Sequence, residues 1–281
     1  MTKAIEVDLS NGLGNRMFQY AFARSYAERH GFELHTPPCM LQRIFQIDDP
    51  PAVDNFPLVA GDHSRTGYAW GVGDRDGEWG IRLTGQRQHQ EELTYTRSDA
   101  KRWFRLRPEM EELVRNVPSM EVVANLRRGD YAYACNPFVV ISEESYLDAC
   151  DEYGIDKTKV YFLDGETHYR IPEIPVESPW VNLDATQQGK MGEGGRLDFL
   201  PDLVLMMRAK VLLRSNSTFA WWAATLGDSE RVFSPDIRAV TPAGPVPGTL
   251  YRAPQHVPFV EGNFPAMCWG WPFLSELHLK P

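Results

Sequence analysis

The stretch that decides the fold is VVANLRRGDY, residues 122–131 of the 281-residue chain. Its first half is apolar and rich in β-branched residues, which predicts a buried strand. Two arginines follow directly, and then a glycine and an aspartate. Packing alone gives no reason for two cations at the end of a buried strand, whereas an anion such as a diphosphate would bind them well. We therefore expect an anion-binding site at the end of this strand.

After Pro118, predicted strands alternate with predicted helices. Apolar runs predict strands at residues 121–126, 159–163, 180–183, 211–214 and 231–234. Helical periodicity predicts helices at residues 143–153, 197–209 and 218–226. Strands separated by helices are typical of a parallel, doubly wound sheet, so we expect an α/β fold.

The first part of the chain begins in the same way. The predicted elements are a strand, a glycine-rich turn, a helix that stops at Gly31 and, further on, helices broken at Pro108: residues 4–9, 11–16, 17–30 and 96–117. Pro118 is the predicted boundary between two domains, residues 1–118 and 119–262. We expect two Rossmann-like, doubly wound domains that face each other across a cleft.

Composition argues against several classes of protein. The net charge of −9, with no basic stripe, argues against a nucleic-acid-binding protein. No segment approaches the ~20 apolar residues that span a bilayer, and no signal-peptide pattern opens the chain, so we expect a cytoplasmic protein or a soluble one trimmed of an anchor. The 4 cysteines are scattered, which favours reduced, buried thiols. The sequence leaves open whether the chain forms a homo-oligomer.

Side chains alternate along the predicted strand at residues 121–126. Asn125 and Arg127 therefore share one face, and Arg128 lies on the other. Ligands of doubly wound sheets lie beyond the carboxyl ends of the strands, so Arg127 is placed to bind a phosphate there. The alternative for either arginine is an ion pair with Asp130 that fixes the loop.

A second polar segment is SNSTFAWWAATL, residues 215–226, which opens a predicted helix after an apolar strand. Its small hydroxyl residues can cap the free N–H groups of the helix start. The same N–H groups and the helix dipole bind anions. Ser217 and Thr218 are therefore either caps or phosphate ligands, and the two arginines on another strand of the predicted sheet favour phosphate.

Two further segments place polar residues at turns. Asp164 ends the predicted strand of YFLDGETH, where its carboxylate would accept hydrogen bonds from guanine; an ordinary Asp-Gly turn is the alternative. The glycines of NGLGNR, residues 11–16, would let the backbone approach a ligand, and a tight structural turn is the alternative. This segment is not GxGxxG and lacks an acidic partner, which argues against nicotinamide binding.

The motif DRD, residues 74–76, has the form that chelates a divalent cation on a diphosphate. Here it lies in the polar stretch GVGDRDGEWG rather than at the end of an apolar strand, so we interpret it as a turn and expect no metal site. A serine hydrolase is also unsupported, because the chain has no GxSxG motif.

Four segments together resemble the α1,2-fucosyltransferase family, whose members use GDP-fucose on a GT-B-like fold. They are NGLGNRMFQYAFA at 11–23, NLRRGDY at 125–131, DLVLMM at 202–207 and SNSTFAWWAA at 215–224. The family forms of three of them are GGLGNQMFQYA, HxRRGDY and SNSTFSWWAA. The order and spacing agree from residue 5 to about 235, so the combination is highly specific although each piece alone is moderate.

The resemblance implies site residues. Arg127 would hold the β-phosphate and neutralise the departing GDP, and Arg128 would support it. The donor would be bound by Gly14, Asn15, Asn125, Asp164, Ser215, Asn216, Ser217 and Thr218. The domain at 1–118 would face the acceptor, the domain at 119–262 would bind the nucleotide sugar, and the tail at 263–281 would pack back on the first domain.

The implied reaction is an inverting, metal-independent transfer of L-fucose from GDP-fucose to a glycan hydroxyl, with α1,2 linkage. GDP-sugar is a co-substrate, and no cofactor is expected. The chain departs from the family at Asn125, which replaces histidine, at Gly165, which replaces a second acidic residue, and at Arg16, which replaces glutamine. These departures leave two alternatives: a different nucleotide-sugar donor, or a catalytically silent member that binds a nucleotide or glycan.

Overall fold

The computed structural model describes residues 4–52, 58–59, 81–83, 93–128, 139–164, 197, 199–240 and 254–264. The described residues form two compact units. Those up to Glu111 belong to the first unit, and those from Glu112 onward belong to the second. Several predicted features lie outside the described residues: the DRD motif at 74–76, Asp130, the strand at 180–183 and the tail from 265 onward. The acceptor and donor sides predicted for the two domains stay predictions.

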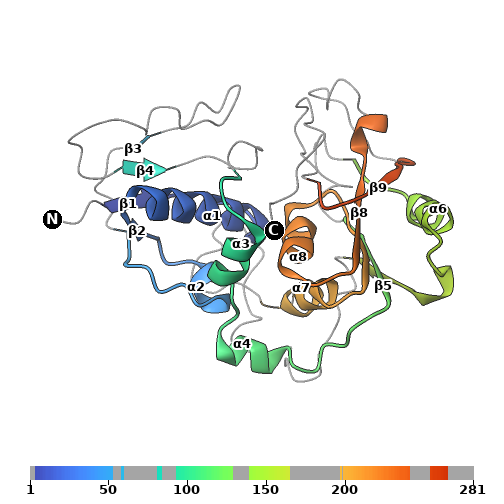
Figure 1. The fold of residues 1–281 in the computed structure, drawn as a ribbon, viewed down its shortest axis with the longest axis horizontal. Coiled ribbons are helices and arrows are strands. Elements are labelled where there is room, and N and C mark those ends of the chain that lie inside the picture. Colours follow the sequence, from blue (N-terminus) through green and yellow to red (C-terminus); the bar gives the residue numbers. More distant parts are fainter. Residues whose placement is uncertain are drawn as a thin grey trace. The chain divides into compact units, whose positions relative to one another are not determined.

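The first unit holds a short parallel sheet. Its strands are β1 (Ala4–Val7), β2 (Glu33–His35), β3 (Leu58–Val59) and β4 (Ile81–Leu83), in the order β2-β1-β4-β3. Its helices are α1 (Leu13–His30), α2 (Met40–Ile44) and α3 (Arg97–Trp103), and α4 (Pro108–Leu113) spans the division between the units (Figure 1). The predicted strand near the N-terminus and the helix break before Pro108 are confirmed, whereas α2 and the three later strands were not predicted.

The helix α1 begins earlier than the sequence predicts. Its first residue is Leu13 rather than residue 17, so Gly14, Asn15 and Arg16 form its first turn and not a glycine loop. The left-handed residue of the preceding turn is Asn11, with φ of 66°. The guanidinium of Arg16 donates to the Asn11 carbonyl oxygen over 2.8 Å, which holds that turn against the helix.

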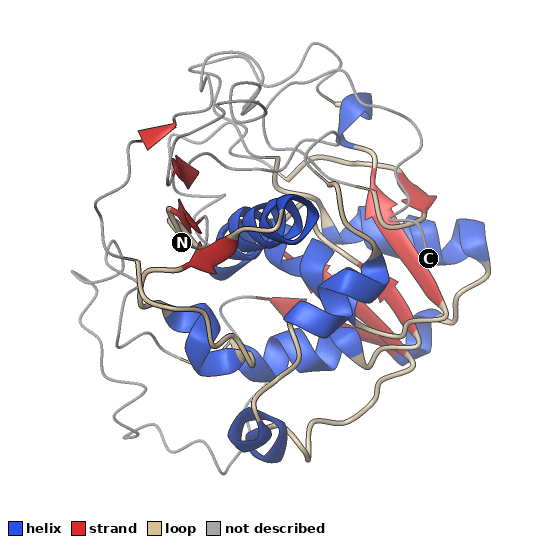
Figure 2. Ribbon diagram, turned by 60° about the vertical axis from the view of Figure 1, so that its left-hand side comes forward, coloured by secondary structure: helices blue, strands red, loops and turns tan. Residues whose placement is uncertain are grey.

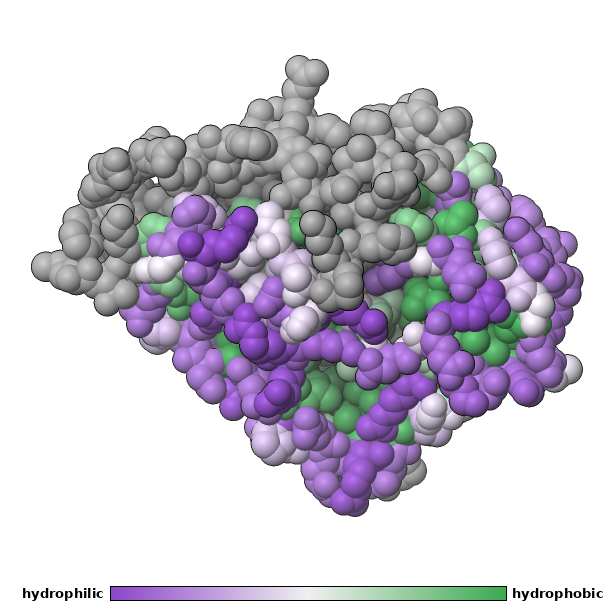
Figure 3. All heavy atoms as spheres, viewed as in Figure 1, coloured by the Kyte–Doolittle hydropathy of each residue, from purple (hydrophilic) through white to green (hydrophobic). Residues whose placement is uncertain are grey.

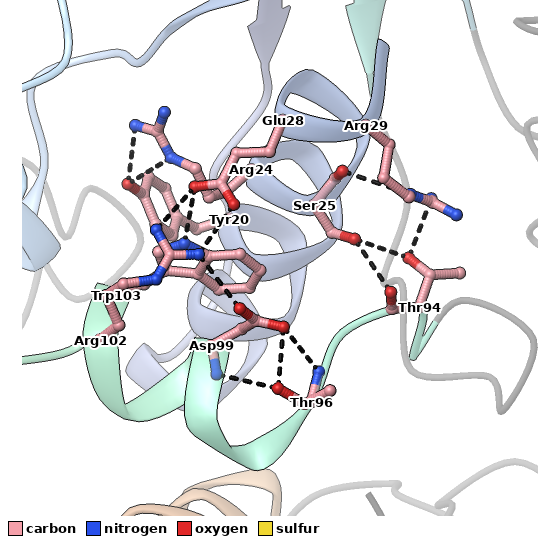
Figure 4. A network of polar contacts seen from close by, with 10 residues as sticks. All are labelled: Tyr20, Arg24, Ser25, Glu28, Arg29, Thr94, Thr96, Asp99, Arg102 and Trp103. Atoms are coloured by element: carbon pink, nitrogen blue, oxygen red, sulfur yellow. Dashed lines mark hydrogen bonds and ion pairs between the residues drawn. The ribbon is translucent and has the colours of Figure 1, made fainter. Parts of the chain in front are cut away.

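The helix α3 is fixed to α1 by hydrogen bonds around Glu28 (Figure 4). Arg102 donates to both carboxylate oxygens of Glu28, at 3.0 and 2.8 Å, and the Trp103 indole donates at 2.9 Å. Thr96 caps α3 by accepting from the Asp99 backbone N–H at 3.1 Å. Burial raises the pKa of Glu28, but the bonds from Arg102 and Trp103 outweigh burial and hold this pKa below its usual value.

The second unit holds a mostly parallel sheet. Its strands are β5 (Val122–Leu126), β6 (Val160–Asp164), β7 (Val211–Leu213), β8 (Arg231–Pro235) and β9 (Phe259–Glu261). Their order is β6-β5-β7-β8-β9, and only β9 runs antiparallel to its neighbour. The predicted parallel sheet is confirmed; β9 was not predicted.

Helices cover both faces of this sheet (Figure 2). They are α6 (Glu143–Tyr153), α7 (Leu200–Met207) and α8 (Thr218–Leu226), with short 3-10 turns at Lys157–Lys159 and Ile237–Ala239. On one face α6 buries Tyr146 and Cys150 against Ala124 and Leu126 of β5. Alternation turns Val123 and Asn125 to the opposite face, where α7 contacts β5 and α8.

The end of α8 approaches α7 so closely that only glycine fits. A Cβ atom built on Gly227 would lie 2.5 Å from the backbone oxygen and 2.6 Å from the Cα atom of Met207. Backbone cannot move aside as a flexible side chain would, so any substitution at Gly227 would push the two helices apart.

On the face drawn in Figure 3, the described surface is mostly hydrophilic, with hydrophobic residues in smaller areas between. Among the described residues, no helix has both the length and the apolar character that crossing a membrane requires.

Candidate functional site

The candidate site lies at the carboxyl ends of β5 and β7. From β5 the chain passes through α6 to β6 on one side, and then through α7 to β7 on the other side of β5. The connections that leave β5 and β7 therefore diverge, and ligands of doubly wound sheets bind at such a switch point. Both polar segments singled out in the sequence begin here, because residues 127–131 follow β5 and residues 215–218 follow β7.

A buried hydrogen-bond network joins the end of β5 to the segment that follows β7. Ala124 is paired in register with Leu213, which brings the next residues of the two strands together. The Ser215 hydroxyl donates to Asn125 Oδ1 over 2.6 Å and lies 3.1 Å from the Ser217 hydroxyl. Asn125, Ser215 and Ser217 are thus brought together as the sequence predicts.

The hydroxyl of Ser217 caps α8. Its Oγ accepts a hydrogen bond from the Ala220 backbone N–H over 3.1 Å, so the capping role considered for this residue is present. Capping satisfies one N–H group of the first turn and leaves the positive end of the helix dipole at the same place. Thr218 is the first residue of the helix and is half-buried.

The remaining polar groups of this edge are held by neighbouring backbone. Asn216, almost fully buried, donates through Nδ2 to the Val139 carbonyl oxygen at 3.1 Å. The Tyr146 hydroxyl donates to the Asn125 carbonyl oxygen at 2.8 Å. Burial raises the pKa of Tyr146 far above its usual value, so this hydroxyl stays a neutral donor.

The two arginines after β5 differ in their surroundings. Arg127 follows the last residue of the strand and is exposed. Arg128 is partly buried and forms an ion pair with Glu143, in the first turn of α6. Arg128 thus forms an ion pair, but with Glu143. The pairing with Asp130 considered from the sequence stays a prediction, because Asp130 lies outside the described residues.

Asp164 is the last residue of β6 and lies opposite Leu126 of β5. Its side chain is half-buried at the carboxyl edge, one strand away from Asn125. This position is compatible with the predicted contact to a base. Gly14 and Asn15 lie in α1 of the first unit, and their predicted place beside the donor stays a prediction.

The residue that the sequence analysis missed is Arg214, directly after β7. It is 0% exposed, and its guanidinium donates to Ser234 Oγ at 3.0 Å and to the Ser215 carbonyl oxygen at 2.9 Å. Burial lowers the pKa of Arg214 to about 9, because the charged form loses its hydration. The signal was present in the order VLLR-SNST, an arginine between an apolar strand and a capping segment.

No cluster of three or more His, Cys, Asp or Glu side chains that could hold a metal ion occurs within the described part of the chain. The DRD motif at 74–76 is not part of it. The buried groups described at the ends of β5 and β7 are hydroxyl, amide and guanidinium groups, which can donate to phosphate oxygens. The carboxylate of Asp164 lies one strand away.

Comparison with protein-family models and with curated proteins gives no match. Among solved structures, NodZ alpha-1,6-fucosyltransferase co-crystallized with GDP matches with a TM-score of 0.53 at 13% identity, over 94% of this chain and 100% of that one. The chain shares with NodZ an α/β fold with parallel sheets. NodZ soaked with GDP-fucose matches with a TM-score of 0.50 at 15% identity, over 93% and 99% of the two chains. Selenomethionine-labelled NodZ from Bradyrhizobium matches with a TM-score of 0.52 at 13% identity, over the same shares. At such identities the likeness to NodZ is one of fold.

Proposed function

We propose that this chain is a glycosyltransferase that moves L-fucose from GDP-fucose to a glycan hydroxyl. The observation that supports the proposal is the hydrogen-bonded contact, at the switch point of the second sheet, between the end of β5 and the segment after β7. Asn125 in β5 and Ser215 and Ser217 after β7 are linked by hydrogen bonds at the start of α8. The fold shared with NodZ and the four sequence motifs support the choice of a GDP-sugar.

In the proposed reaction, the acceptor hydroxyl attacks the anomeric carbon while the bond from this carbon to GDP breaks. The acceptor enters opposite the leaving group, so the configuration inverts. Arg127, exposed at the end of β5, would bind the β-phosphate and stabilise the negative charge that develops on it. Arg128, which pairs with Glu143, would fix the loop from which Arg127 extends. The start of α8 would supply N–H groups to the diphosphate.

The other proposed contacts to the GDP-sugar are inferred from where the residues lie. Asp164 would accept from guanine at the end of β6, and Asn125 would stand where the family has a histidine. Gly14 and Asn15 would approach the donor from the first unit, which would require the two units to face a common cleft as in a GT-B arrangement. The reaction would need no metal, because the arginines and helix N–H groups carry the charge stabilisation.

The linkage of the product is the finer part of the proposal. The sequence motifs resemble the α1,2-fucosyltransferase family, whereas NodZ is described as alpha-1,6. We propose α1,2 linkage and a cytoplasmic location. Linkage analysis of the product by nuclear magnetic resonance tests the first, and another linkage would leave the transferase proposal intact but move the chain away from the α1,2 family.

The deciding experiment is calorimetric titration with GDP, UDP and ADP, each with and without a chelator. We expect GDP alone to bind tightly, and the chelator to have no effect. Transfer assays with GDP-sugars and glycan acceptors then follow. Preference for UDP or dependence on a divalent cation would overturn the fucose proposal. GDP binding without any transfer would favour a silent binding protein, for which the substitution of Asn125 for histidine is the motivating observation.

A further inference from the structure

Arg214 is a buried cation with no acidic partner among the residues that the structure describes. Its contacts are a serine hydroxyl, that of Ser234, and a backbone carbonyl oxygen, that of Ser215. Within the described residues Nη2 is buried without a hydrogen-bond partner. The titratable group that acts on its charge is Tyr146, which is neutral. Buried arginines are normally paired with a carboxylate, and none is among these contacts.

An unpaired buried charge destabilises a folded protein, and replacing it with an apolar side chain often stabilises the fold. The surrounding strands would accept such a side chain, because Leu212 and Leu213 before Arg214 are fully buried. Folding alone therefore gives no reason for an arginine here. A group that arrives from outside the fold and carries negative charge would give one.

The place of Arg214 indicates which group that is. The residue follows β7 at the carboxyl edge of the sheet and precedes the segment 215–217 that leads into α8. Ala124 of β5 pairs with Leu213 of β7, so one residue further along Arg214 lies beside Asn125. Alternation turns it away from Leu213, which packs in the core with α6, and so toward the face covered by α8. The positive end of the α8 dipole and the Arg214 charge thus act on one side of the sheet edge.

Arg214 also orients the backbone at that edge. One nitrogen of its guanidinium donates to the Ser215 carbonyl oxygen at 2.9 Å. In a trans peptide the carbonyl and the next N–H point in opposite directions, so this bond turns the Asn216 N–H away from Arg214. The hydroxyl of Ser215 is at the same time held by Asn125. The segment is thus fixed from both sides.

We propose that Arg214 is the buried counter-charge for a diphosphate bound at the start of α8, and that it positions the segment 215–217 which receives this anion. The inference rests on the proposed function, since the anion would belong to the nucleotide donor. Arg214 acts through its charge and through Ser215, so it is a positioning residue. The charge balance of this edge is complete only when the anion is bound.

The test compares Arg214→Gln, which keeps hydrogen-bond donors and loses the charge, with Arg214→Lys, which keeps the charge. The full chain is titrated calorimetrically with GDP, inorganic pyrophosphate and guanosine. We expect Arg214→Gln to weaken GDP and pyrophosphate binding by roughly 30-fold, the effect of one charge at several ångströms in a medium of intermediate polarity. Guanosine binding should not change. Arg214→Lys should keep most of the affinity.

Thermal unfolding without ligand supplies the second measurement. Arg214→Gln should unfold at the same temperature as the wild type or a higher one, because the unpaired charge is gone. The matched control is Arg208→Gln, since Arg208 also donates to backbone carbonyl oxygens, those of Val114, Arg115 and Val117. Arg208 precedes β7, at the opposite end of that strand from Arg214. This control should lower the unfolding temperature and leave pyrophosphate affinity unchanged.

Three outcomes overturn the inference or separate it from the proposed function. Wild-type GDP affinity in Arg214→Gln overturns the inference and leaves the transferase intact. A lower unfolding temperature in Arg214→Gln, with guanosine and GDP weakened alike, shows a structural arginine and also overturns it. Pyrophosphate binding that depends on Arg214, in a wild type that does not bind GDP, supports the inference and removes the proposed donor.

Discussion

At the residue scale, the two arginines after β5 have different surroundings. Arg127 is exposed at the end of the strand, and Arg128 is partly buried and pairs with Glu143 of α6. We predict that Arg127→Ala lowers kcat for fucose transfer by roughly 100- to 1,000-fold, as removal of a charge-stabilising donor does elsewhere. The side chain is exposed, so we expect the unfolding temperature to change by little, as for other surface substitutions. Steady-state kinetics and thermal unfolding together measure both parts.

The matched control for this variant is Arg115→Ala. Arg115 is an exposed arginine of the same unit whose partner is Glu112 on the surface. Its removal should alter neither kcat nor stability by a measurable amount, because exposed ion pairs contribute little. Equal turnover in Arg127→Ala and the wild type would contradict the role given to Arg127.

Some features of the candidate site could be predicted from the sequence, and others could not. Alternation along residues 121–126 correctly separates Asn125 from Arg128, and the serine-rich helix start correctly indicates a cap at Ser217. The burial of Arg214 was not predicted, because an arginine after a short apolar strand is usually exposed. Its burial depends on residues distant in sequence, such as Ser234. The partner of Arg128 is likewise set by the docking of α6.

At the scale of the element, the start of α8 is the feature to test. Ser217 and Ser142 are both N-caps, of α8 and α6, and each accepts a backbone N–H three residues on. We predict that Ser217→Ala and Ser142→Ala each lower the free energy of unfolding by about 1 kcal/mol. Only Ser217→Ala should also weaken GDP binding, because only α8 begins at the proposed diphosphate site. Denaturant unfolding and calorimetry distinguish the two effects, and equal loss of affinity would remove α8 from the site.

The docking of α3 on α1 predicts a dependence on pH. The pKa of Glu28 is held below its usual value, so its bonds stabilise the fold above the unfolded pKa of about 4.3 and are lost as pH falls through the lower folded value. We predict that Glu28→Gln is less stable than the wild type at neutral pH and that the difference shrinks below about pH 4. Denaturant unfolding at several pH values measures it.

A double-mutant cycle with Arg102→Met is the control for this element. Arg102 donates to both oxygens of Glu28, so the double variant should lose less than the sum of the single losses. Additive losses would show that the pair is not coupled and that the pH dependence has another source.

Among the elements, those with a clear period or a clear boundary were predicted. The helices α6 and α8 have the predicted bounds, and β5, β6, β7 and β8 agree within one residue at either end. The strand β9 was not predicted, because it follows a proline-rich stretch and is only three residues long. The start of α1 was misjudged because Gly12 and Gly14 suggested a loop, whereas Asn11 takes the left-handed turn.

At the scale of the whole molecule, the proposed site confines the direct effect of the nucleotide to particular segments. Ligand at 100 times its Kd adds about 2.7 kcal/mol to the stability of the unit that binds it. We predict that GDP slows amide hydrogen exchange at the end of β5 and at the start of α8, and leaves α3 unchanged. Exchange followed by mass spectrometry resolves these segments. Protection concentrated in α3 would place the nucleotide site elsewhere.

Gly227, at the C-terminal end of α8, could influence the proposed site at the other end of this helix. The 9 residues of α8 span about 14 Å, and such a helix moves as a rigid rod, so a displacement at one end is passed to the other. A methyl group on Gly227, 2.5 Å from the Met207 backbone oxygen, would shift the rod and move Ser217 away from Ser215. Gly227 would therefore control the alignment of the proposed donor site. Gly227→Ala should lower turnover although it touches no substrate.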